Sequence, residues 1–516
     1  MKEKKSAFQR FCAAAVLLMA GLILAGFVLA GLFVSVHLGT GGGRSEAITF
    51  VRLSLAQSAI LPLLALGAAV LIQKLLERFA PLSAGLVLLW AAVSLVIVWG
   101  LGAQQIYDAG TITEAARLFA RGNYKMMESD YLNVYSYQLG MCLPMEILLR
   151  IFKGADLNLM MQGINVLLTA GTGLAVTALA QKLLPDSRKA CSALCLLVLP
   201  APLYCMHVYG TIPMLFFGTL AILFFVEYLH THRAGFGWGY AVMLAVSYML
   251  KPNAAILVIA LAICSVLDAV QKRSFRPLLF TVLSVALSVL LIRGVIWQYE
   301  WRSGVQLREN ISALARFTMG LQEGGGAAGW YSGYTEQFFP LEVSAAQEAV
   351  IVSADLSARL AQMGADPEMA VHFFGEKLLS QWIEPTYGTL WQGMMTAQAG
   401  AEWAGTAAGH TGPLASWAAL YAEGSPIKAA AEMLAHGGQM ALYLLALLGL
   451  MSAFGRRDDT AQTVLPLIFL GGVLYHLLFE AKSQYAYPYI VYMLPLAAQG
   501  LCVLEKQVKR KKGRLS

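Results

Sequence analysis

Charged residues are scarce in this 516-residue sequence. Asp, Glu, Lys and Arg together make up 13% of it, whereas a soluble domain carries roughly 25%. Hydrophobic residues account for 58%, and the mean hydropathy is +0.62. A composition this poor in charge excludes an ordinary soluble globular protein and indicates a membrane protein that crosses the bilayer several times.

Signature motifs of several enzyme classes are also missing. The sequence contains no GxxxxGK[ST] phosphate loop, no GxSxG elbow, no HExxH zinc motif and no CxxC pair. These absences count against nucleotide hydrolysis, metalloproteolysis and thiol redox chemistry. Seven cysteines are present in or beside apolar segments, and none falls within 298–436. We therefore expect no disulfide framework.

Apolar runs recur along the whole chain. A spanning helix needs about 20 mainly apolar residues, and on this criterion we expect about twelve crossings and an all-α polytopic bundle. The first run is too long for a signal peptide and is predicted to be an uncleaved anchor. The predicted spans are 11–36, 53–72, 84–103, 158–184, 190–207, 212–228, 238–250, 254–270, 277–297, 437–454, 464–479 and 486–504.

Basic residues mark alternate ends of these spans. Excess Lys and Arg beside short loops is typical of the cytoplasmic side, so the net charge of +7 reports topology rather than nucleic-acid binding. Both termini are then cytoplasmic, and five segments lie outside: 104–157, 207–211, 251–253, 298–436 and 480–485. The marking residues are Lys2, Lys4, Lys5, Arg10, Lys74, Arg78, Lys182, Arg188, Lys189, His232, Arg233, Lys272, Arg273, Arg276, Arg456, Arg457, Lys506, Lys509, Arg510, Lys511 and Lys512.

This topology divides the chain into three parts. Residues 1–297 form an N-terminal membrane module, 298–436 an extracellular helical loop, and 437–516 the last spans with a basic cytoplasmic tail. The loop holds fourteen acidic and six basic residues, and a glycine run at 324–326 separates its amphipathic helices, which indicates a lid. The apolar segment 139–152 is too short to cross, so we expect it to be re-entrant or surface-lying.

Asp108 is the strongest candidate for chemistry. It follows the apolar run 86–102 by about one turn, at the boundary between lipid and water. Polar residues at that depth are costly and are more often functional than decorative. We expect Asp108 to act as a general base or to organise a ligand. The alternative is that it caps the N-terminus of the following helix, and the two roles are compatible.

Two further groups of residues are candidates for ligand binding. Lys251 and Lys482 are cations in predicted outer segments, where each either binds a lipid-linked phosphate or reaches lipid headgroups. Aromatic and amide side chains near the outer surface either form an interfacial belt or a wall for a sugar ring. These candidates are Tyr107, Tyr131, Tyr135, Gln138, Tyr485 and Trp382, the last in a stretch that suits either carbohydrate contact or docking of the loop onto the bundle.

Five passages carry a resemblance to a known family. They are YDAG with ARLFARGNY, YSYQLG before LRIF, VYGTIP, LKPN and EAKSQY, at 107–124, 135–152, 208–213, 250–253 and 480–485. In these passages the chain resembles the GT-C superfamily of integral-membrane glycosyltransferases, in the protein-mannosyltransferase-like and ArnT-like branch of Gram-positive bacteria. The resemblance spans most of the chain.

The resemblance implies transfer of a sugar from a polyprenyl-phosphate donor, with inversion, to an extracytoplasmic glycan, glycolipid or protein. By position, Asp108 matches the first-loop acid of the family, and Lys251 and Lys482 match positions that hold the donor phosphate. Lysine stands at 482 where arginine is common, and arginine is the better bidentate phosphate ligand. The loop 207–213 has no acid, which argues against a two-carboxylate metal site and leaves a divalent cation as an open question.

Other function classes remain as alternatives. A transporter or flippase of lipid-linked glycans usually shows broken helices in corresponding positions of two halves, and here only Lys251 and Pro252 interrupt a predicted helix. A polymerase or ligase of lipid-linked glycans is expected to have more outside arginines. The predicted partners are therefore the lipid-linked donor, an acceptor and membrane lipids, with no nucleic acid.

Overall fold

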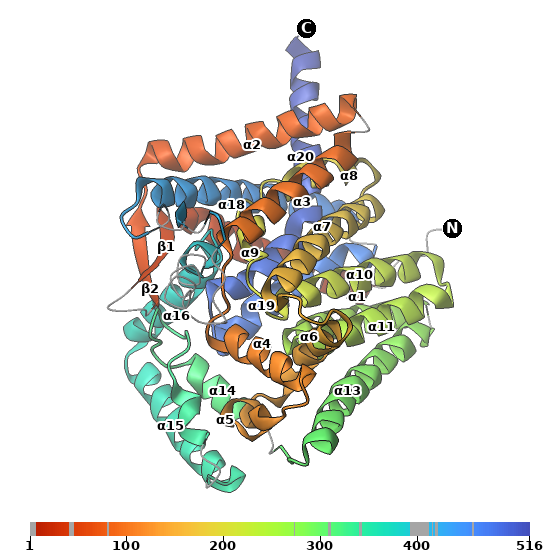
Figure 1. Ribbon diagram of the computed structural model, residues 1–516. Coiled ribbons are helices and arrows are strands. Elements are labelled where there is room, and N and C mark those ends of the chain that lie inside the picture. Colours follow the sequence, from red (N-terminus) through yellow and green to blue (C-terminus); the bar gives the residue numbers. More distant parts are fainter. Residues whose placement is uncertain are drawn as a thin grey trace.

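The computed structural model describes residues 7–40, 46–79, 82–272, 274–307, 311–339, 343–392, 412–414, 416–417, 420, 422–456 and 459–515. Helices make up nearly all of its regular structure (Figure 1). In chain order the elements are α1 (Ala7–Gly31), β1 (Val34–Thr40), β2 (Glu46–Arg52), α2 (Leu55–Arg78), α3 (Leu82–Leu101), α4 (Tyr107–Ala120), α5 (Asp130–Val134), α6 (Leu139–Ile151), α7 (Leu157–Leu183), α8 (Arg188–Cys195), α9 (Ala201–Tyr204), α10 (Thr211–Thr231), α11 (Ala234–Leu250), α12 (Ala255–Lys272), α13 (Arg276–Ser303), α14 (Ala313–Gly320), α15 (Ala345–Ala365), α16 (Pro367–Trp382), α18 (Pro426–Ala453), α19 (Ala461–Leu478) and α20 (Ser483–Leu515).

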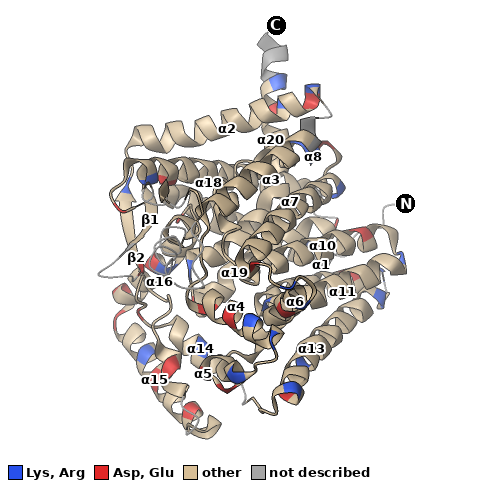
Figure 2. Cartoon of the chain, in the orientation of Figure 1, with Lys and Arg blue, Asp and Glu red and all other residues tan. Residues whose placement is uncertain are grey.

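Nine helices in the described ranges are long and apolar enough to cross a membrane: α1, α2, α7, α10, α12, α13, α18, α19 and α20. Two shorter apolar helices, α3 and α11, accompany them. Figure 2 shows few charges along these helices and more at their ends and on α15. The chain is an all-α, multi-pass membrane protein, as its composition predicts. Several residues used to predict its orientation lie outside the described residues: Lys2, Lys4, Lys5, Arg273 and Arg457.

Close helix packing builds the scaffold. Helices α18 and α20 approach so tightly that a Cβ on Gly449 would lie 1.9 Å from the Leu496 carbonyl oxygen, and one on Gly500 would lie 1.8 Å from that of Leu445. Small residues permit such contacts between membrane helices, where packing rather than water exclusion drives association. The large buried core of the bundle extends from this pair to α1, α7, α10 and α19.

One predicted span is wrong. Residues 190–207 do not form a single helix, because α8 ends at Cys195 and the chain turns before the short α9. Pro200 and Pro202 explain the break, since proline lacks an amide hydrogen and clashes with the preceding helical turn. Apolar content alone did not reveal it.

The first predicted span also ends too late. Helix α1 stops at Gly31, and residues 34–40 form β1, which pairs antiparallel with β2 from Val34 opposite Arg52 to Thr40 opposite Glu46. Strand β1 has β-branched residues at alternate positions, Val34 and Val36, and β2 contains three of them, Ile48, Thr49 and Val51. Such residues fit a pleated surface better than a helix. This two-stranded hairpin joins α1 to α2 and was not predicted.

Helices α4 to α6 form a small layer beside the bundle. The expected short helix at 139–152 is α6, which has 13 residues and packs against α4, α11 and α13. It is fastened to α13 by the buried Glu146 carboxylate, which accepts hydrogen bonds from Tyr299 at 2.6 Å and from Arg302. This layer carries Asp108 near the start of α4.

The expected loop helices are present as α14, α15 and α16. Ser344 caps α15 with a reciprocal Gln347 pair, and Asp366 caps α16. The end of α16 enters the bundle: the Trp382 ring stacks on Phe27 at 5.5 Å, and its carbonyl accepts the Tyr443 hydroxyl at 2.6 Å. Residues 393–411 of the predicted lid lie outside the described residues.

Candidate functional site

Three loops and two short helices converge around Asp108. The nearest cations that act on its carboxylate are Lys482, between α19 and α20, and Lys251, between α11 and α12. The Tyr131 and Tyr209 hydroxyls hydrogen-bond to the same carboxylate. Residues about 375 positions apart in sequence therefore share one site, which is the arrangement that the predicted topology permits.

The surroundings of Asp108 alter its acidity. The side chain is exposed, yet enough protein surrounds it that burial raises its pKa above the usual 3.8, although Lys482 and the hydrogen bond from Tyr131 act in the opposite direction. The carboxylate is therefore reachable from solvent, although protein surrounds much of it. It binds a proton more readily than a free aspartate, which suits a general base.

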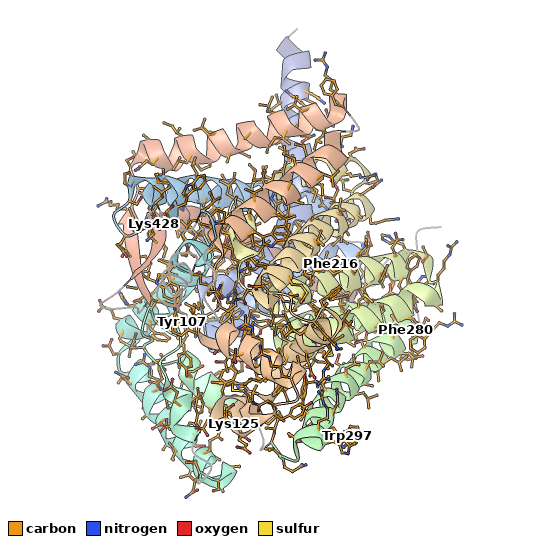
Figure 3. All side chains as sticks on the ribbon, viewed as in Figure 1. Tyr107, Lys125, Phe216, Phe280, Trp297 and Lys428 are labelled. Carbon is orange, nitrogen blue, oxygen red and sulfur yellow. The ribbon has the colours of Figure 1, made fainter. Side chains whose placement is uncertain are left out.

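Asp108 is not the N-cap of α4. That position is Ile106, which makes no side-chain cap, and Asp108 lies in the first turn where its charge favours the helix dipole. The preceding residue, Tyr107, has φ = +51°, a left-handed conformation that costs of order 1–3 kcal/mol for a non-glycine residue. Its exposed ring stacks on Trp391 at 6.5 Å, and Figure 3 shows it where α4 faces α16.

Lys251 is a nearly buried cation with spare hydrogen-bonding capacity. Its ammonium donates to Thr211 Oγ1 at 2.7 Å and lies 4.2 Å from the centre of the Tyr209 ring and 5.6 Å from that of Tyr485. Burial lowers its pKa to about 7, against the pull of Asp108 and Glu480. In the described part of the chain no carboxylate forms an ion pair with it, so two of its three donors remain for a ligand.

Lys482 is held differently. It forms an ion pair with Glu46 of β2, and its ammonium lies 5.9 Å and 5.8 Å from the ring centres of Trp330 and Trp391. The pair joins residues 436 positions apart. Sequence reasoning missed Glu46, because only the pairing of β1 with β2 carries it to the site. The β-branched residues Ile48, Thr49 and Val51 were the available signal.

An amide and two phenols orient the Asp108 carboxylate. Gln138 donates from Nε2 to the hydroxyls of Tyr131 and Tyr209, and these phenols in turn bond to Asp108. Burial raises the pKa of both phenols, so they keep their protons and act as donors. Tyr209 was not among the predicted residues, although it lies in the VYGTIP passage.

The remaining predicted residues lie at different distances from this centre. Tyr485 donates to Glu480 at 2.9 Å and stacks on His476 beside Lys251. Tyr135 faces α14 and the turn after it, where it contacts Thr335, Phe339 and Arg316. Trp382 is fully buried in the bundle core, where its packing accounts for it.

His207 also faces the two lysines. Its ring lies between Tyr204, at 6.3 Å, and Tyr209, at 5.5 Å. Burial lowers its pKa to about 3, and Lys251 and Lys482 add to the effect, so the imidazole is neutral at pH 7. Over the ranges that the structure describes, no three His, Cys, Asp or Glu side chains gather closely enough to hold a metal ion.

Comparisons with known proteins add a likeness to solved structures. No family model matches the chain, and no curated protein matches it. Among solved structures, it is similar to the archaeal oligosaccharyltransferase AglB from Archaeoglobus fulgidus in complex with an inhibitory peptide and a dolichol-phosphate, at 12% sequence identity and a TM-score of 0.43. The match covers 85% of this chain and 52% of the other, so the chain spans about half the length of that protein.

Proposed function

We propose that the protein is a glycosyltransferase that moves a sugar from a polyprenyl-phosphate donor to an extracytoplasmic acceptor. One observation carries the proposal: the exposed Asp108 carboxylate lies within the electrostatic influence of both Lys251 and Lys482, on a membrane scaffold. In such an arrangement the carboxylate can accept the proton of the attacking hydroxyl, and the two cations can stabilise the departing phosphate.

The proposed reaction is a single displacement. The acceptor hydroxyl attacks the anomeric carbon while Asp108 takes its proton, and the bond between that carbon and the phosphate oxygen breaks. Inversion follows because the nucleophile enters opposite the leaving group. Polyprenyl phosphate leaves with the bonding electrons, and Lys251 and Lys482 stabilise its growing negative charge without a general acid.

The other side chains have supporting roles in this scheme. Tyr131 and Tyr209 hold the Asp108 carboxylate in one orientation through hydrogen bonds, which favours a near-attack geometry. The exposed Tyr107 ring, stacked on Trp391, offers an aromatic face for a sugar. In this proposal the site faces the outside, both termini are cytoplasmic, and the acceptor is a cell-wall polymer, a glycolipid or a protein.

Substitution of Asp108 tests the proposal directly. Purified protein in lipid vesicles receives radiolabelled polyprenyl-phosphate sugar and a panel of envelope acceptors, and the release of polyprenyl phosphate is measured. We expect Asp108→Asn to lower the rate by roughly 10²- to 10⁴-fold, as loss of a general base does. The matched control is Glu114→Gln, an exposed acid on the same helix, which should leave the rate unchanged. Wild-type turnover by Asp108→Asn would show the base assignment to be wrong.

A transporter of lipid-linked glycan is the second candidate. The break between α8 and α9 favours it, because transporters bind their substrates at interrupted helices. The same vesicles distinguish the two functions: a transporter moves the labelled donor between leaflets and leaves its sugar–phosphate bond intact, whereas a transferase breaks that bond only when an acceptor is present.

A further inference from the structure

A large cleft lies away from the lysines that flank Asp108. Its volume is about 900 Å³, near the upper end of the roughly 300–1,000 Å³ range of small-molecule sites. Helices α2, α3, α7, α8 and α20 surround it, and Figure 1 shows α3, α7, α8 and α20 side by side in the upper part of the molecule. The turn at 196–200, where a straight helix was expected, leaves room for it.

The walls of this cleft are apolar and face lipid. Leu88 of α3 and Leu174 of α7 line it and are 70% and 57% exposed. Two lining hydroxyls, those of Thr172 and Ser192, donate to carbonyls of their own helices. Their polarity is therefore satisfied within the protein, and the surface offered to an occupant is mainly apolar.

An aromatic pair closes the inner end of the cleft. Tyr487 lines it and stacks on Tyr204 at 4.2 Å, and both rings are almost completely buried. Tyr204 in turn lies against His207, which faces Lys251 and Lys482. The pair separates the cleft from those two lysines, so an anionic group on an occupant needs cations elsewhere.

Such cations lie at the opposite end. Arg188 and Lys189 line the cleft, are exposed, and occupy the first turn of α8. The neighbouring acids are already paired, Asp186 with Lys506 and Glu227 with Lys182. Within the described ranges neither Arg188 nor Lys189 forms an ion pair.

The placement of these two cations is unfavourable for the helix itself. Positive side chains in the first turn oppose the helix dipole, and Ser187 provides no cap because its hydroxyl donates to the carbonyls of Ala180 and Leu184. A bound anion would offset the unfavourable charges and the missing cap, because it would interact with the two cations and with the positive end of the helix dipole.

We propose that this cleft binds an acidic glycerophospholipid, with its phosphate on Arg188 and Lys189 and its acyl chains along α3, α7 and α20. Excess Lys and Arg marks the membrane face where acidic phospholipids give the surface its negative potential, so the occupant is abundant at the end where the cations lie. The site is independent of the proposed transferase activity and stands if that activity is disproved.

Lipid titration of the delipidated, full-length protein tests the proposal. Bound lipid is counted by native mass spectrometry while dioleoyl phosphatidylglycerol, dioleoyl phosphatidylcholine or polyprenyl phosphate is added. We expect one tightly bound phosphatidylglycerol, displaced by salt. Arg188→Gln/Lys189→Gln should weaken its binding roughly 10- to 30-fold. The matched control is Arg233→Gln/Arg276→Gln, which removes two exposed basic residues outside the cleft and should bind like wild type.

A second variant fills the cleft without altering its charge. A Cβ at Gly173 would meet only Cys195 Sγ, at 3.9 Å, so Gly173→Leu is tolerated by the helix and projects into the lipid volume. It should abolish binding of phosphatidylglycerol at this site. Equal affinity for the zwitterionic lipid, unchanged binding by both variants, or preferential occupancy by polyprenyl phosphate would each overturn the proposal.

Discussion

At the scale of single residues, the candidate site depends on ionisable groups whose protonation the fold has changed. Asp108 holds its proton more strongly than a free aspartate, and Lys251 holds its proton more weakly than a free lysine, in both cases mainly through burial. Shifts of this kind cluster at functional sites. The base and the cation are therefore both in their working forms only between two pH limits.

Deprotonation of Lys251 sets the upper pH limit. As pH rises through about 7, the ligand-free protein loses the charge on this side chain, so we expect the KM for the donor to increase on the alkaline side. As pH falls toward the raised pKa of Asp108, the base becomes protonated and kcat decreases. Lys251→Arg keeps its charge and should move the alkaline limb of the donor KM profile upward.

The control for this profile is Lys125→Arg, which alters an exposed lysine beside the same layer that is absent from the groups acting on Asp108 and Lys251 (Figure 3). Its profile should match that of the wild type. An alkaline limb that stays in place in Lys251→Arg would mean that another group sets the upper limit.

Glu146 gives a residue-scale prediction about stability. Its side chain is 1% exposed, and this burial by itself raises the pKa of the carboxyl. Hydrogen bonds from Arg302, Tyr299 and Arg150 have a larger effect in the opposite direction, so the pKa lies below the usual 4.5. Glu146→Ala leaves Arg302 unpaired and should lower the free energy of unfolding by about 3–5 kcal/mol. Thermal unfolding in detergent measures this, with the exposed Glu128→Ala as control.

The sign of the pH effect follows from the lowered pKa. Because the folded protein binds the Glu146 proton less tightly than the unfolded chain, its contribution is complete above about 4.5 and is lost as pH falls through the lower folded value. The destabilisation caused by Glu146→Ala should therefore shrink below pH 4.5. A difference that stays constant down to pH 3 would contradict the paired-carboxylate explanation.

At the scale of elements, the β1–β2 hairpin connects the N-terminal spans with the site. In the middle of β1, His37 pairs with Glu432 of α18 at 2.9 Å, and Lys428 donates to the Leu38 carbonyl at 3.1 Å. At the start of β2, Glu46 holds Lys482. In the proposed mechanism the donor phosphate must compete with a carboxylate that the hairpin supplies.

Removal of this competing charge should favour the donor. We expect Glu46→Gln to bind the polyprenyl-phosphate sugar roughly three- to ten-fold more tightly. This is the change in affinity expected when the donor no longer has to displace a partly exposed ion pair. Donor affinity is measured by isothermal titration in detergent. Arg52→Gln, at the opposite end of β2, serves as control. Weaker binding by Glu46→Gln would show that Glu46 positions Lys482 rather than competing for it.

At the scale of the whole molecule, the side of the membrane on which the site lies decides which substrates reach it. Trp297 and Trp301 stack at 6.5 Å near the C-terminal end of α13, where they are 65% and 74% exposed (Figure 3). Exposed tryptophans of this kind favour the headgroup layer. The helices α14 to α16 follow this end of the chain, so we expect their exposed parts to lie on one side of the bilayer.

Cysteine labelling tests which side that is. Gly325→Cys lies on an exposed turn beyond α14, and we expect an impermeant maleimide to label it in intact cells. Gly455→Cys, equally exposed but after α18, should react only after the cells are opened. The wild-type protein provides the background, because Cys12 and Cys195 are partly exposed. The opposite pattern would place Asp108 in the cytoplasm and remove the basis for an extracytoplasmic acceptor.

Much of the architecture follows from local sequence. Long apolar runs become helices because every backbone group in lipid must find an internal partner, and this identified α2, α7, α10, α13, α19 and α20. The starts of α15 and α16 are likewise local, because Ser344 and Asp366 cap them. Asp108 and Lys251 stood out as charges at the edges of apolar runs, where a charge is unusual.

The amino-acid sequence is enough to show that this protein spans a membrane and that its few boundary charges are the residues to examine. The contacts of Glu46 with Lys482, of Tyr209 with Asp108 and of Trp382 with Phe27 become visible only in the folded chain. The physical reason is that these contacts join residues a hundred or more positions apart in the sequence. Periodicity and hydropathy report only near neighbours, whereas charge pairing and ring stacking depend on the packed arrangement of the whole chain.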